Sequence, residues 1–166
     1  MVRTLTNRVR TNSPQLTSCI GSLLALELLH PSDTLYLVAP MIRNTALLPT
    51  SLGQFSSLAQ DDTTLAISLA SILSQLTDLG TNVYLIHQTS DVTSEEFLIT
   101  LPDSIHRRHI DNPLPLGLFS EHFSIRGWLN FTEVGISMKD QVEISLEQSE
   151  ISKSLLQVRS LWEDGR

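Results

Sequence analysis

The segment Gly127-Trp128-Leu129-Asn130-Phe131-Thr132-Glu133-Val134-Gly135-Ile136 is the most informative part of this sequence. It follows two short segments, residues 114–118 and 122–126, which flank a predicted turn at Ser120-Glu121 and contain the apolar residues Leu114, Leu116, Leu118, Phe123 and Ile125. Short segments of this kind on either side of a tight turn favour a pair of antiparallel strands. We therefore expect a β-hairpin to lead directly into residues 127–136, with Gly127-Trp128-Leu129-Asn130 forming a turn.

Upstream of this hairpin, helices and buried strands alternate. A first helix is predicted to begin at Ser13-Pro14, because serine is a favoured N-cap and proline is tolerated at the first helical position. Leucine and isoleucine then recur at helical spacing until Pro31 ends the helix. The continuous apolar runs at residues 34–40 and 82–87 predict strands that are buried on both faces.

Three further helices and one more strand complete the pattern. Helical spacing predicts a helix over residues 62–79, with Gly80 as its C-terminal stop. A capping box opens a short helix over residues 93–101. Residues 141–146 alternate as a strand does, and residues 151–162 close the chain as an amphipathic helix.

This alternation predicts an α/β sandwich in which helices flank a mixed β-sheet. A length of 166 residues corresponds to one domain that is large enough to bury a hydrophobic core. We assign residues 14–166 to that single domain and residues 1–13 to an N-terminal arm.

The balance of charge bears on the kind of partner. The chain has 11 basic and 18 acidic residues, so its formal net charge is −7. This net charge argues against a protein that coats nucleic acid electrostatically, although it is compatible with a local basic cleft. Charged residues make up 17% of the sequence, below the ordinary value of about 25%. A surface so poor in charge fits an obligate assembly, and it fits equally a surface solvated by Ser, Thr, Asn and Gln.

The sequence predicts no metal and no cofactor. Cys19 is the single cysteine, so an internal disulfide is excluded, and its apolar neighbours favour a buried thiol. The histidines lack metal-ligand spacing, and no glycine-rich phosphate loop or nucleophile elbow is present. No apolar run approaches the ~20 residues of a membrane span, and the N-terminus lacks a signal peptide's apolar segment. We therefore expect a cytoplasmic protein that does not associate with membranes.

Residues 127–136 resemble the second half of the motif of the phospholipase D superfamily, in particular its small nuclease-like members with one motif per chain. That motif reads His-x-Lys, four residues, Asp, six residues, and then Gly-Ser-x-Asn. Residues 35–42 are similar to the first core strand of that family, and the following helix and strand come in the same order. The resemblance covers roughly residues 14–163 and implies the phospholipase D-like α/β sandwich.

Counting along the motif places unsuitable residues at its reactive positions. Pro113 and Pro115 stand where the family has histidine and lysine, Ser120 where it has aspartate, and Trp128 where it has serine. Proline offers neither a nucleophile nor a proton donor, and it lacks a backbone N–H. An indole at Trp128 would fill the phosphate pocket. The resemblance therefore implies a degenerate motif without catalytic residues.

Two positions of the motif are retained, Asn130 and Glu133. We expect structural roles for them, with Asn130 bonding to turn backbone and Glu133 fastening a neighbouring loop; contact with a ligand is the alternative. Arg107, Arg108 and Arg126 lie near the motif in sequence, and we name them as candidate contacts to nucleic acid or to a partner. For Arg107 and Arg108 the alternative is a pair of solvent-exposed side chains without a binding role.

A shifted alignment of the sequence with the motif would allow a residual hydrolytic activity. It would bring His109 into the nucleophile position, but it lengthens the spacing to Gly127 by four residues and puts Asp111 at the lysine position. A carboxylate at that position repels phosphate. A metal-independent nuclease or phosphodiesterase that uses His109 or His122 therefore stays an alternative, and a nucleic-acid-binding module built on the three arginines is another.

The function that the resemblance implies best is that of a catalytically inactive subunit, which acts as a scaffold or adaptor in a nucleic-acid-processing complex. Similar small domains occur beside helicases and ATPases in prokaryotic restriction and anti-phage systems, so we expect such a setting. Family members with one motif per chain usually pair. We accordingly expect a homodimer or a heteromeric complex, with residues 113–136 near the interface.

Overall fold

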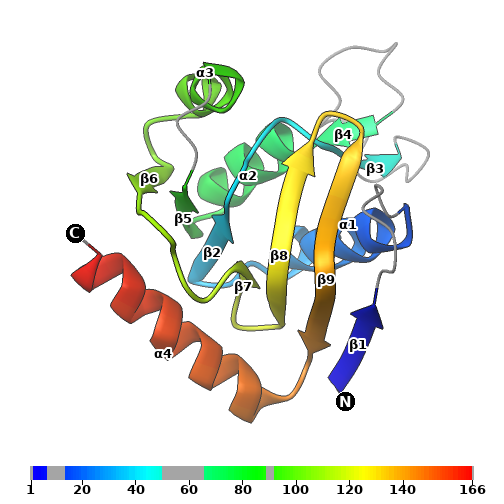
Figure 1. Cartoon of the computed structure of the whole chain (residues 1–166). Helices are drawn as coiled ribbons and strands as arrows, with labels where there is room; N and C mark the ends of the chain where they lie inside the picture. Colours follow the sequence, from blue (N-terminus) through cyan, green and yellow to red (C-terminus); the bar gives the residue numbers. More distant parts are fainter. Residues whose placement is uncertain (1, 7–13, 50–65, 89–91, 166) are drawn as a thin grey trace.

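The computed structural model describes residues 2–6, 14–49, 66–88 and 92–165 (Figure 1). In these residues the helices are α1 (Pro14–Leu29), α2 (Leu69–Asp78), α3 (Val92–Thr100) and α4 (Gln148–Asp164). The strands are β1 (Val2–Thr6), β2 (Thr34–Ala39), β3 (Ala46–Pro49), β4 (Ala66–Ser68), β5 (Asn82–His87), β6 (His106–His109), β7 (Gly117–Phe119), β8 (Ser124–Thr132) and β9 (Gly135–Ser145). Within the same residues, no helix combines the length and apolar character that a membrane crossing requires.

Strands from both halves of the chain form one mixed sheet. Among the described residues it has seven strands in the order β1-β9-β8-β7-β2-β5-β6, while β3 and β4 pair separately. Strands β2, β5 and β6 are parallel, and β7, β8, β9 and β1 continue from β2 as an antiparallel series. The predicted α/β fold with a mixed sheet flanked by helices is confirmed.

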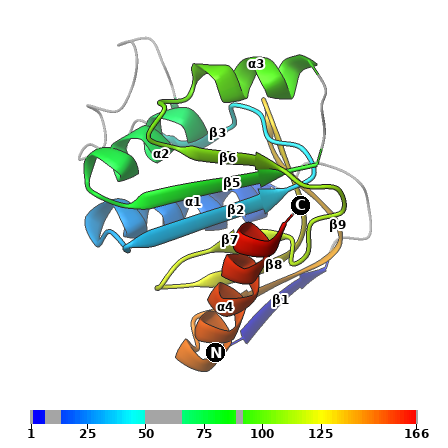
Figure 2. The same cartoon turned by 90° about the vertical axis from the view of Figure 1, so that its left-hand side faces the viewer.

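Helices cover both faces of this sheet (Figure 2). α1 and α2 pack on one face and form the larger core with the strands. On the other face, Val158 of α4 joins a smaller core. Because side chains alternate along a strand, β2 sends Leu35 and Leu37 into the larger core and Tyr36 and Val38 into the smaller one. A continuous apolar run was therefore the correct signal for a strand buried on both faces.

Most predicted elements are confirmed with small changes at their ends. α1 ends shortly before Pro31, and β2 and β5 are the two buried strands. Gly80 follows α2 with a φ of 98°, and its N–H donates to the carbonyl oxygen of Thr77 at 3.0 Å. Glycine adopts this left-handed conformation at little cost, which explains why the helix stops there. The predicted N-cap at Ser13 lies outside the described residues.

The predicted helix over residues 62–79 is wrong near its start. Residues 66–68 form β4, and α2 begins at Leu69; residues 62–65 lie outside the described part of the chain. The Oγ of Ser68 accepts a hydrogen bond from the backbone N of Ser71 at 3.3 Å and caps α2. A serine at the N-cap ends the strand and starts the helix, a signal that helical spacing of leucines does not reveal.

The sequence did not predict β1, β3 and β6. Residues 1–13 were expected to be an arm, but Val2–Thr6 pairs antiparallel with β9 and extends the sheet; residues 7–13 lie outside the described part. β6 has the sequence His-Arg-Arg-His, without the apolar residues that mark a buried strand. As the outermost strand beside β5, it forms an edge, where polar residues are ordinary.

Gly117 at the start of β7 provides a stability prediction. Its φ is 146°, and a Cβ there would lie 1.8 Å from the backbone oxygen of Ile125. Gly80 also has a positive φ, but a Cβ there would meet no atom within 4 Å. Gly117→Ala is therefore expected to lower the free energy of unfolding by about 3 kcal/mol or more, against about 1 kcal/mol for Gly80→Ala. Urea denaturation measures both, and equal losses would contradict the packing at Gly117.

Candidate functional site

Ser120 lies at the tip of the β7–β8 hairpin and is fully buried. Its Oγ accepts hydrogen bonds from the backbone N of His122 at 3.1 Å and of Phe123 at 3.3 Å. Its own N donates to the carbonyl oxygen of Phe123 at 3.0 Å. The hydroxyl therefore holds a tight turn together, as serine side chains commonly do. Ser120, which the resemblance aligns with the motif's aspartate, thus has its hydroxyl bonded to backbone groups of its own turn.

Pro113 and Pro115 precede β7 and belong to no strand. Pro113 is buried and Pro115 is half-buried. The strand predicted over residues 114–118 starts only at Gly117, because a proline has no N–H to donate to a ladder. The carbonyl oxygen of Leu116 still accepts a hydrogen bond from the neighbouring strand, from the N of Gly127 at 3.0 Å. The chain thus joins the sheet only after the two prolines, which the resemblance aligns with the motif's histidine and lysine.

Gly127 lies at a bulge within the β8–β9 hairpin, which corrects the expected turn. Arg126 pairs with Glu143 and Trp128 pairs with Lys139, so β9 has three residues opposite this one glycine. Gly127 has a φ of 145°, and a Cβ there would lie 2.7 Å from a backbone oxygen of β9. Only glycine fits this close approach. Bulges re-aim the side chains that follow, here Trp128.

Trp128 and Asn130 lie on the face of β8 opposite the larger core. Leu129 and Phe131 belong to that core, and side chains alternate along the strand. α4 lies near the start of β8, away from the β8–β9 turn (Figure 1). Trp128, Asn130, Ser137, Met138 and Lys139 line a pocket of about 290 Å³ on the uncovered part. The Nζ of Lys139 lies 5.0 Å from the centroid of the Trp128 ring, a cation–π contact.

Ser137 and Lys139 were not found by sequence reasoning. They enter the pocket because Asn130 pairs with Ser137 and Trp128 with Lys139 across the hairpin. This register depends on the bulge, and two extra residues in β9 are invisible in the alternation of the sequence. An expectation that β9 begins at residue 141 also left both residues outside the strand.

The two retained motif residues lie in different places. Asn130 is half-exposed in β8 and forms a β-bridge with Met41, and the N of Phe131 donates to the carbonyl oxygen of Met41 at 3.2 Å. Glu133 is exposed in the β8–β9 turn, beside a hollow of about 260 Å³ that Arg43 and α3 also line. Among the described residues the Asn130 side chain forms no hydrogen bond, so its expected bond to turn backbone is not observed, and the role expected for Glu133 stays a prediction.

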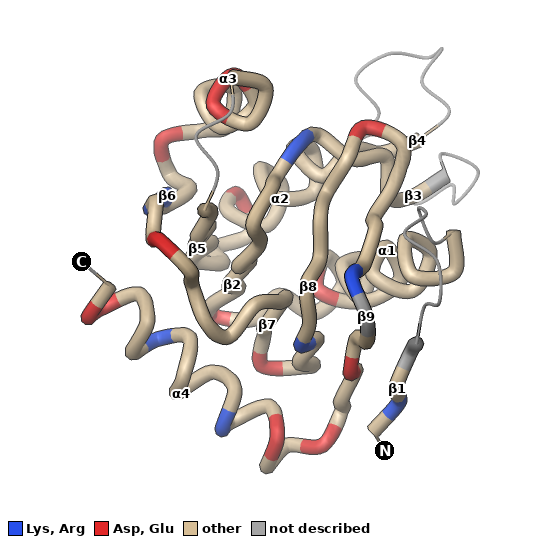
Figure 3. Tube along the Cα trace, viewed as in Figure 1, with Lys and Arg blue, Asp and Glu red and all other residues tan. Residues whose placement is uncertain are grey.

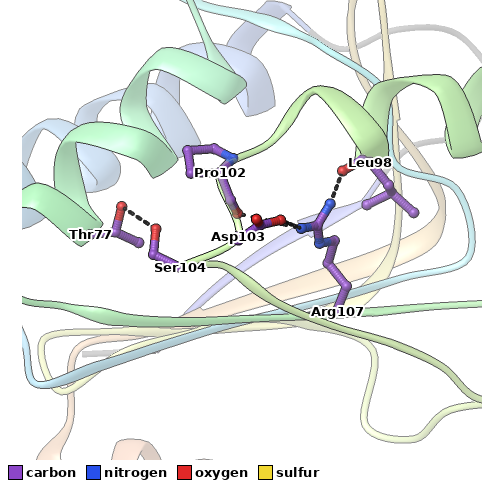
Figure 4. Close-up of polar contacts among 6 residues, drawn as sticks. All are labelled: Thr77, Leu98, Pro102, Asp103, Ser104 and Arg107. Atoms are coloured by element: carbon purple, nitrogen blue, oxygen red, sulfur yellow. Dashed lines mark hydrogen bonds and ion pairs between the residues drawn. The ribbon is translucent and has the colours of Figure 1, made fainter.

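Arg107 is bound to the end of α3 and the loop after it (Figure 4). Its guanidinium donates to the carbonyl oxygen of Leu98, and its Nη2 lies 3.4 Å from the Oδ1 of Asp103. Nη2 also lies 3.5 Å from the carbonyl oxygen of Pro102. The side chain thus fastens α3 to β6. This is a contact within the chain rather than a free cation.

Arg108 points to the opposite face of β6, toward the C-terminus of α4. It donates to the carbonyl oxygen of Trp162 and, at 3.1 Å, to that of Gly165. Its guanidinium carbon lies 4.8 Å from the centroid of the Trp162 ring. A cation at a helix C-terminus satisfies carbonyl groups that lack helical partners and interacts favourably with the helix dipole. Arg108 therefore anchors α4.

Arg126 also contacts α4, near its middle. Its Nε donates to the Oγ of Ser154 at 2.9 Å, and its Nη2 donates to the Oε1 of Gln157. The three predicted arginines therefore do not form one basic surface: Arg107 faces α3, while Arg108 and Arg126 bind different parts of α4. Figure 3 shows basic and acidic positions interspersed along the described chain, including α4.

A ladder of rings under α4 was not predicted. Tyr36, Tyr84 and His106 are paired in register across β2, β5 and β6, with ring centroids 4.7 and 4.8 Å apart. Trp162 of α4 meets the Tyr84 ring edge-on at 4.9 Å. Burial raises the pKa of Tyr36, and a hydrogen bond with Arg159 of α4 opposes this shift. The ladder fixes α4 on this part of the sheet.

His109 and His122 lie near opposite ends of the parallel strands. The ring of His122 donates from Nε2 to the carbonyl oxygen of His30 at 2.8 Å, beside the start of β2. His109 ends β6, and its Nε2 donates to the carbonyl oxygen of Gln88 at 2.8 Å. Because β2 and β6 run parallel, the start of one and the end of the other are far apart. The structure does not bring these two histidines into one site.

Cys19 and the metal-binding side-chain types are the remaining candidates for a reactive site. Burial raises the pKa of the Cys19 thiol, a shift that Arg3 partly opposes, and so favours the protonated and unreactive form. Across residues 2–6, 14–49, 66–88 and 92–165, no three His, Cys, Asp or Glu side chains are arranged to hold a metal ion.

Solved structures of other proteins resemble the fold of this chain. No family model and no curated protein matches the sequence. The solved structure of Nuc from Salmonella typhimurium, described as a phospholipase D family member, matches 100% of this chain and 96% of its own, with 15% identity and a TM-score of 0.60. NucT from Helicobacter pylori matches 98% of this chain and 97% of its own, with 8% identity and a TM-score of 0.54.

A larger protein contains the same fold. Polyphosphate kinase from Porphyromonas gingivalis matches all of this chain with 8% identity and a TM-score of 0.60, but the match spans only 26% of that protein. At these low identities the likeness concerns the fold. The chain has a phospholipase D-like fold, the fold of the solved structures of Nuc and NucT.

The anchoring role of Arg108 can be tested directly. Arg108→Ala is expected to lower the free energy of unfolding by about 2 kcal/mol, because it removes hydrogen bonds to the end of α4 and the contact with Trp162. Urea denaturation followed by circular dichroism measures this loss. Lys153→Ala, an exposed change on α4, is the control and should cost about 0.5 kcal/mol or less. Equal losses in the two variants would contradict the anchoring role.

Proposed function

We propose that this chain is a catalytically inactive phospholipase D-like subunit that acts as a scaffold or adaptor in a nucleic-acid-processing complex. The observation that carries the proposal is the occupation of the four reactive motif positions by Pro113, Pro115, Ser120 and Trp128. The prolines lie outside β7, the Ser120 hydroxyl holds a turn, and the Trp128 indole contacts Lys139. Proline and indole carry no nucleophile, and the Ser120 hydroxyl is fully buried and bonded to its own turn.

The biological setting rests on resemblance. Small phospholipase D-like domains occur beside helicases and ATPases in prokaryotic anti-phage systems, and we propose that kind of complex, in the cytoplasm and away from membranes. The solved structure of the archaeal chromatin protein TrmBL2 is described as showing a novel mode of DNA binding. It matches 100% of this chain and 54% of its own, with 9% identity and a TM-score of 0.50. Contact with nucleic acid through the complex agrees with that likeness.

The surface that we propose for the partner lies between residues 113–116 and α4. A groove of about 810 Å³ runs there, and Leu114, Pro115 and Leu156 are among its lining residues. Leu114 is 73% exposed and Leu156 is 68% exposed. Neighbouring exposed leucines are a feature of protein–protein contacts more than of solvated surface. A second copy of this chain is the partner that we propose, and a heteromeric partner is the alternative.

A residual nuclease is the second function to weigh. It would depend on His109 or His122, and each ring already donates to a backbone carbonyl, the two carbonyls lying near opposite ends of the parallel strands. A nucleic-acid-binding module is the third. Its arginines, Arg107, Arg108 and Arg126, are engaged with α3 and α4, and the net charge of −7 opposes binding to a polyanion.

The absence of catalysis is tested by hydrolysis without metal. Single-stranded DNA and bis(p-nitrophenyl) phosphate are expected to react no faster with the protein than in buffer, because prolines stand at the positions aligned with the motif's histidine and lysine and supply no nucleophile. His109→Ala and His122→Ala should give the same rates as the unchanged chain. Turnover that one of these variants abolishes, and that His30→Ala retains, would overturn the proposal.

The scaffold role is tested by mass. Light scattering is expected to give a homodimer, and purification from native cells a complex of higher mass. Leu156→Glu should dissociate the contact, because it places a carboxylate in an apolar surface. Ile99→Glu is the matched control, since Ile99 is 78% exposed on α3, away from the groove. A stable monomer that carries no partner would contradict the scaffold role.

A further inference from the structure

The pocket between β8 and β9 has chemistry that the scaffold role does not use. Lys139 is exposed beside Trp128. Within the described side chains, no carboxylate forms an ion pair with its Nζ. An ammonium group that is fixed over a ring but not neutralised is suited to an anion, and phosphate is the anion that lysine commonly binds as a point charge.

Trp128 provides a second and different kind of contact. Its indole is half-buried on the open face of β8 and lines the pocket. A planar apolar ring at a pocket wall favours a planar ligand, and stacking of a base on an aromatic side chain contributes about 1–3 kcal/mol. The indole N–H adds one hydrogen-bond donor.

Asn130 and Ser137 supply the polar groups between these two. They pair with each other across the hairpin, and both line the pocket. Within the described residues, neither side chain has a hydrogen-bond partner. A carboxamide offers donors and an acceptor, and a hydroxyl offers both, so together they can bond to a base edge or to phosphate oxygens.

The size and charge of the pocket limit the ligand. About 290 Å³ suits a single small molecule and not a duplex. Among the five lining residues, Lys139 alone is charged. One charge matches one phosphate group rather than several successive phosphates of a nucleic-acid backbone. We propose that this pocket binds one nucleoside monophosphate unit, with Trp128 against the base and Lys139 on the phosphate. Free nucleotide and the end of a single strand both present this unit. The proposal goes beyond the scaffold role and does not depend on it.

Nuclear magnetic resonance of the indole N–H groups tests the proposal on the intact chain. The chain has two tryptophans, and Trp128→Phe assigns their signals. Adenosine monophosphate is expected to shift the Trp128 signal saturably and to leave that of Trp162 in place. Adenosine alone and inorganic phosphate alone should each bind at least about tenfold more weakly, because each lacks one of the two contacts. A short oligothymidylate provides the strand arm: tighter binding than thymidine monophosphate places the unit in a strand, and equal or weaker binding makes it a free nucleotide.

Matched lysine variants locate the phosphate contact. Lys139→Ala is expected to weaken binding about tenfold or more through loss of a charge-assisted contact, while Lys139→Arg retains it. Lys153→Ala, on α4, should leave binding unchanged. The proposal is overturned if neither nucleotide probe shifts the Trp128 signal saturably, if phosphate alone binds as well as adenosine monophosphate, or if both alanine variants weaken binding equally. These results come from the isolated chain and are distinct from those on mass and partners.

Discussion

The three residues of β7 join the two parts of the sheet, and the remaining structure depends on this short pairing. β7 connects the parallel strands β2, β5 and β6 with the antiparallel series β8, β9 and β1. It does so through Gly117, Leu118 and Phe119, all of them buried. The prolines before Gly117 prevent a longer strand. Beyond that point Met41 pairs directly with Asn130, so the two parts stay joined where β7 is absent.

The short β7 also divides the face of the sheet that is opposite α1 and α2. On β2, β5 and β6, the ladder of Tyr36, Tyr84 and His106 meets Trp162 and holds α4. On β8 and β9, toward their connecting turn, the bulge at Gly127 presents Trp128 beside Lys139. The first area is covered and structural, and the second is open and polar. A small ligand can reach the second area, where the pocket lined by Trp128 and Lys139 lies.

The sequence was sufficient for the class of fold because the buried strands β2 and β5 are continuous apolar runs, which few other structures explain. It was insufficient where structure depends on partners distant in the chain. β6 consists of His106–His109 and is a strand only because β5 lies beside it. Lys139 faces Trp128 only because β9 has extra residues at a bulge, which the two-residue period of a strand conceals. Likewise, Arg107 and Arg108 are neighbours in sequence, yet a strand sends them to α3 and to α4.

The positions that the resemblance aligns with the motif's reactive residues make other contacts in this chain. Ser120 closes a turn, Pro113 is buried, Pro115 lines the groove beside α4, and Trp128 contacts Lys139. A buried polar group without a partner destabilises a fold. The Ser120 hydroxyl has partners in its own turn, and the Trp128 indole has one in Lys139. The two side chains are thus accommodated by local contacts, which agrees with the proposal that this surface serves for binding.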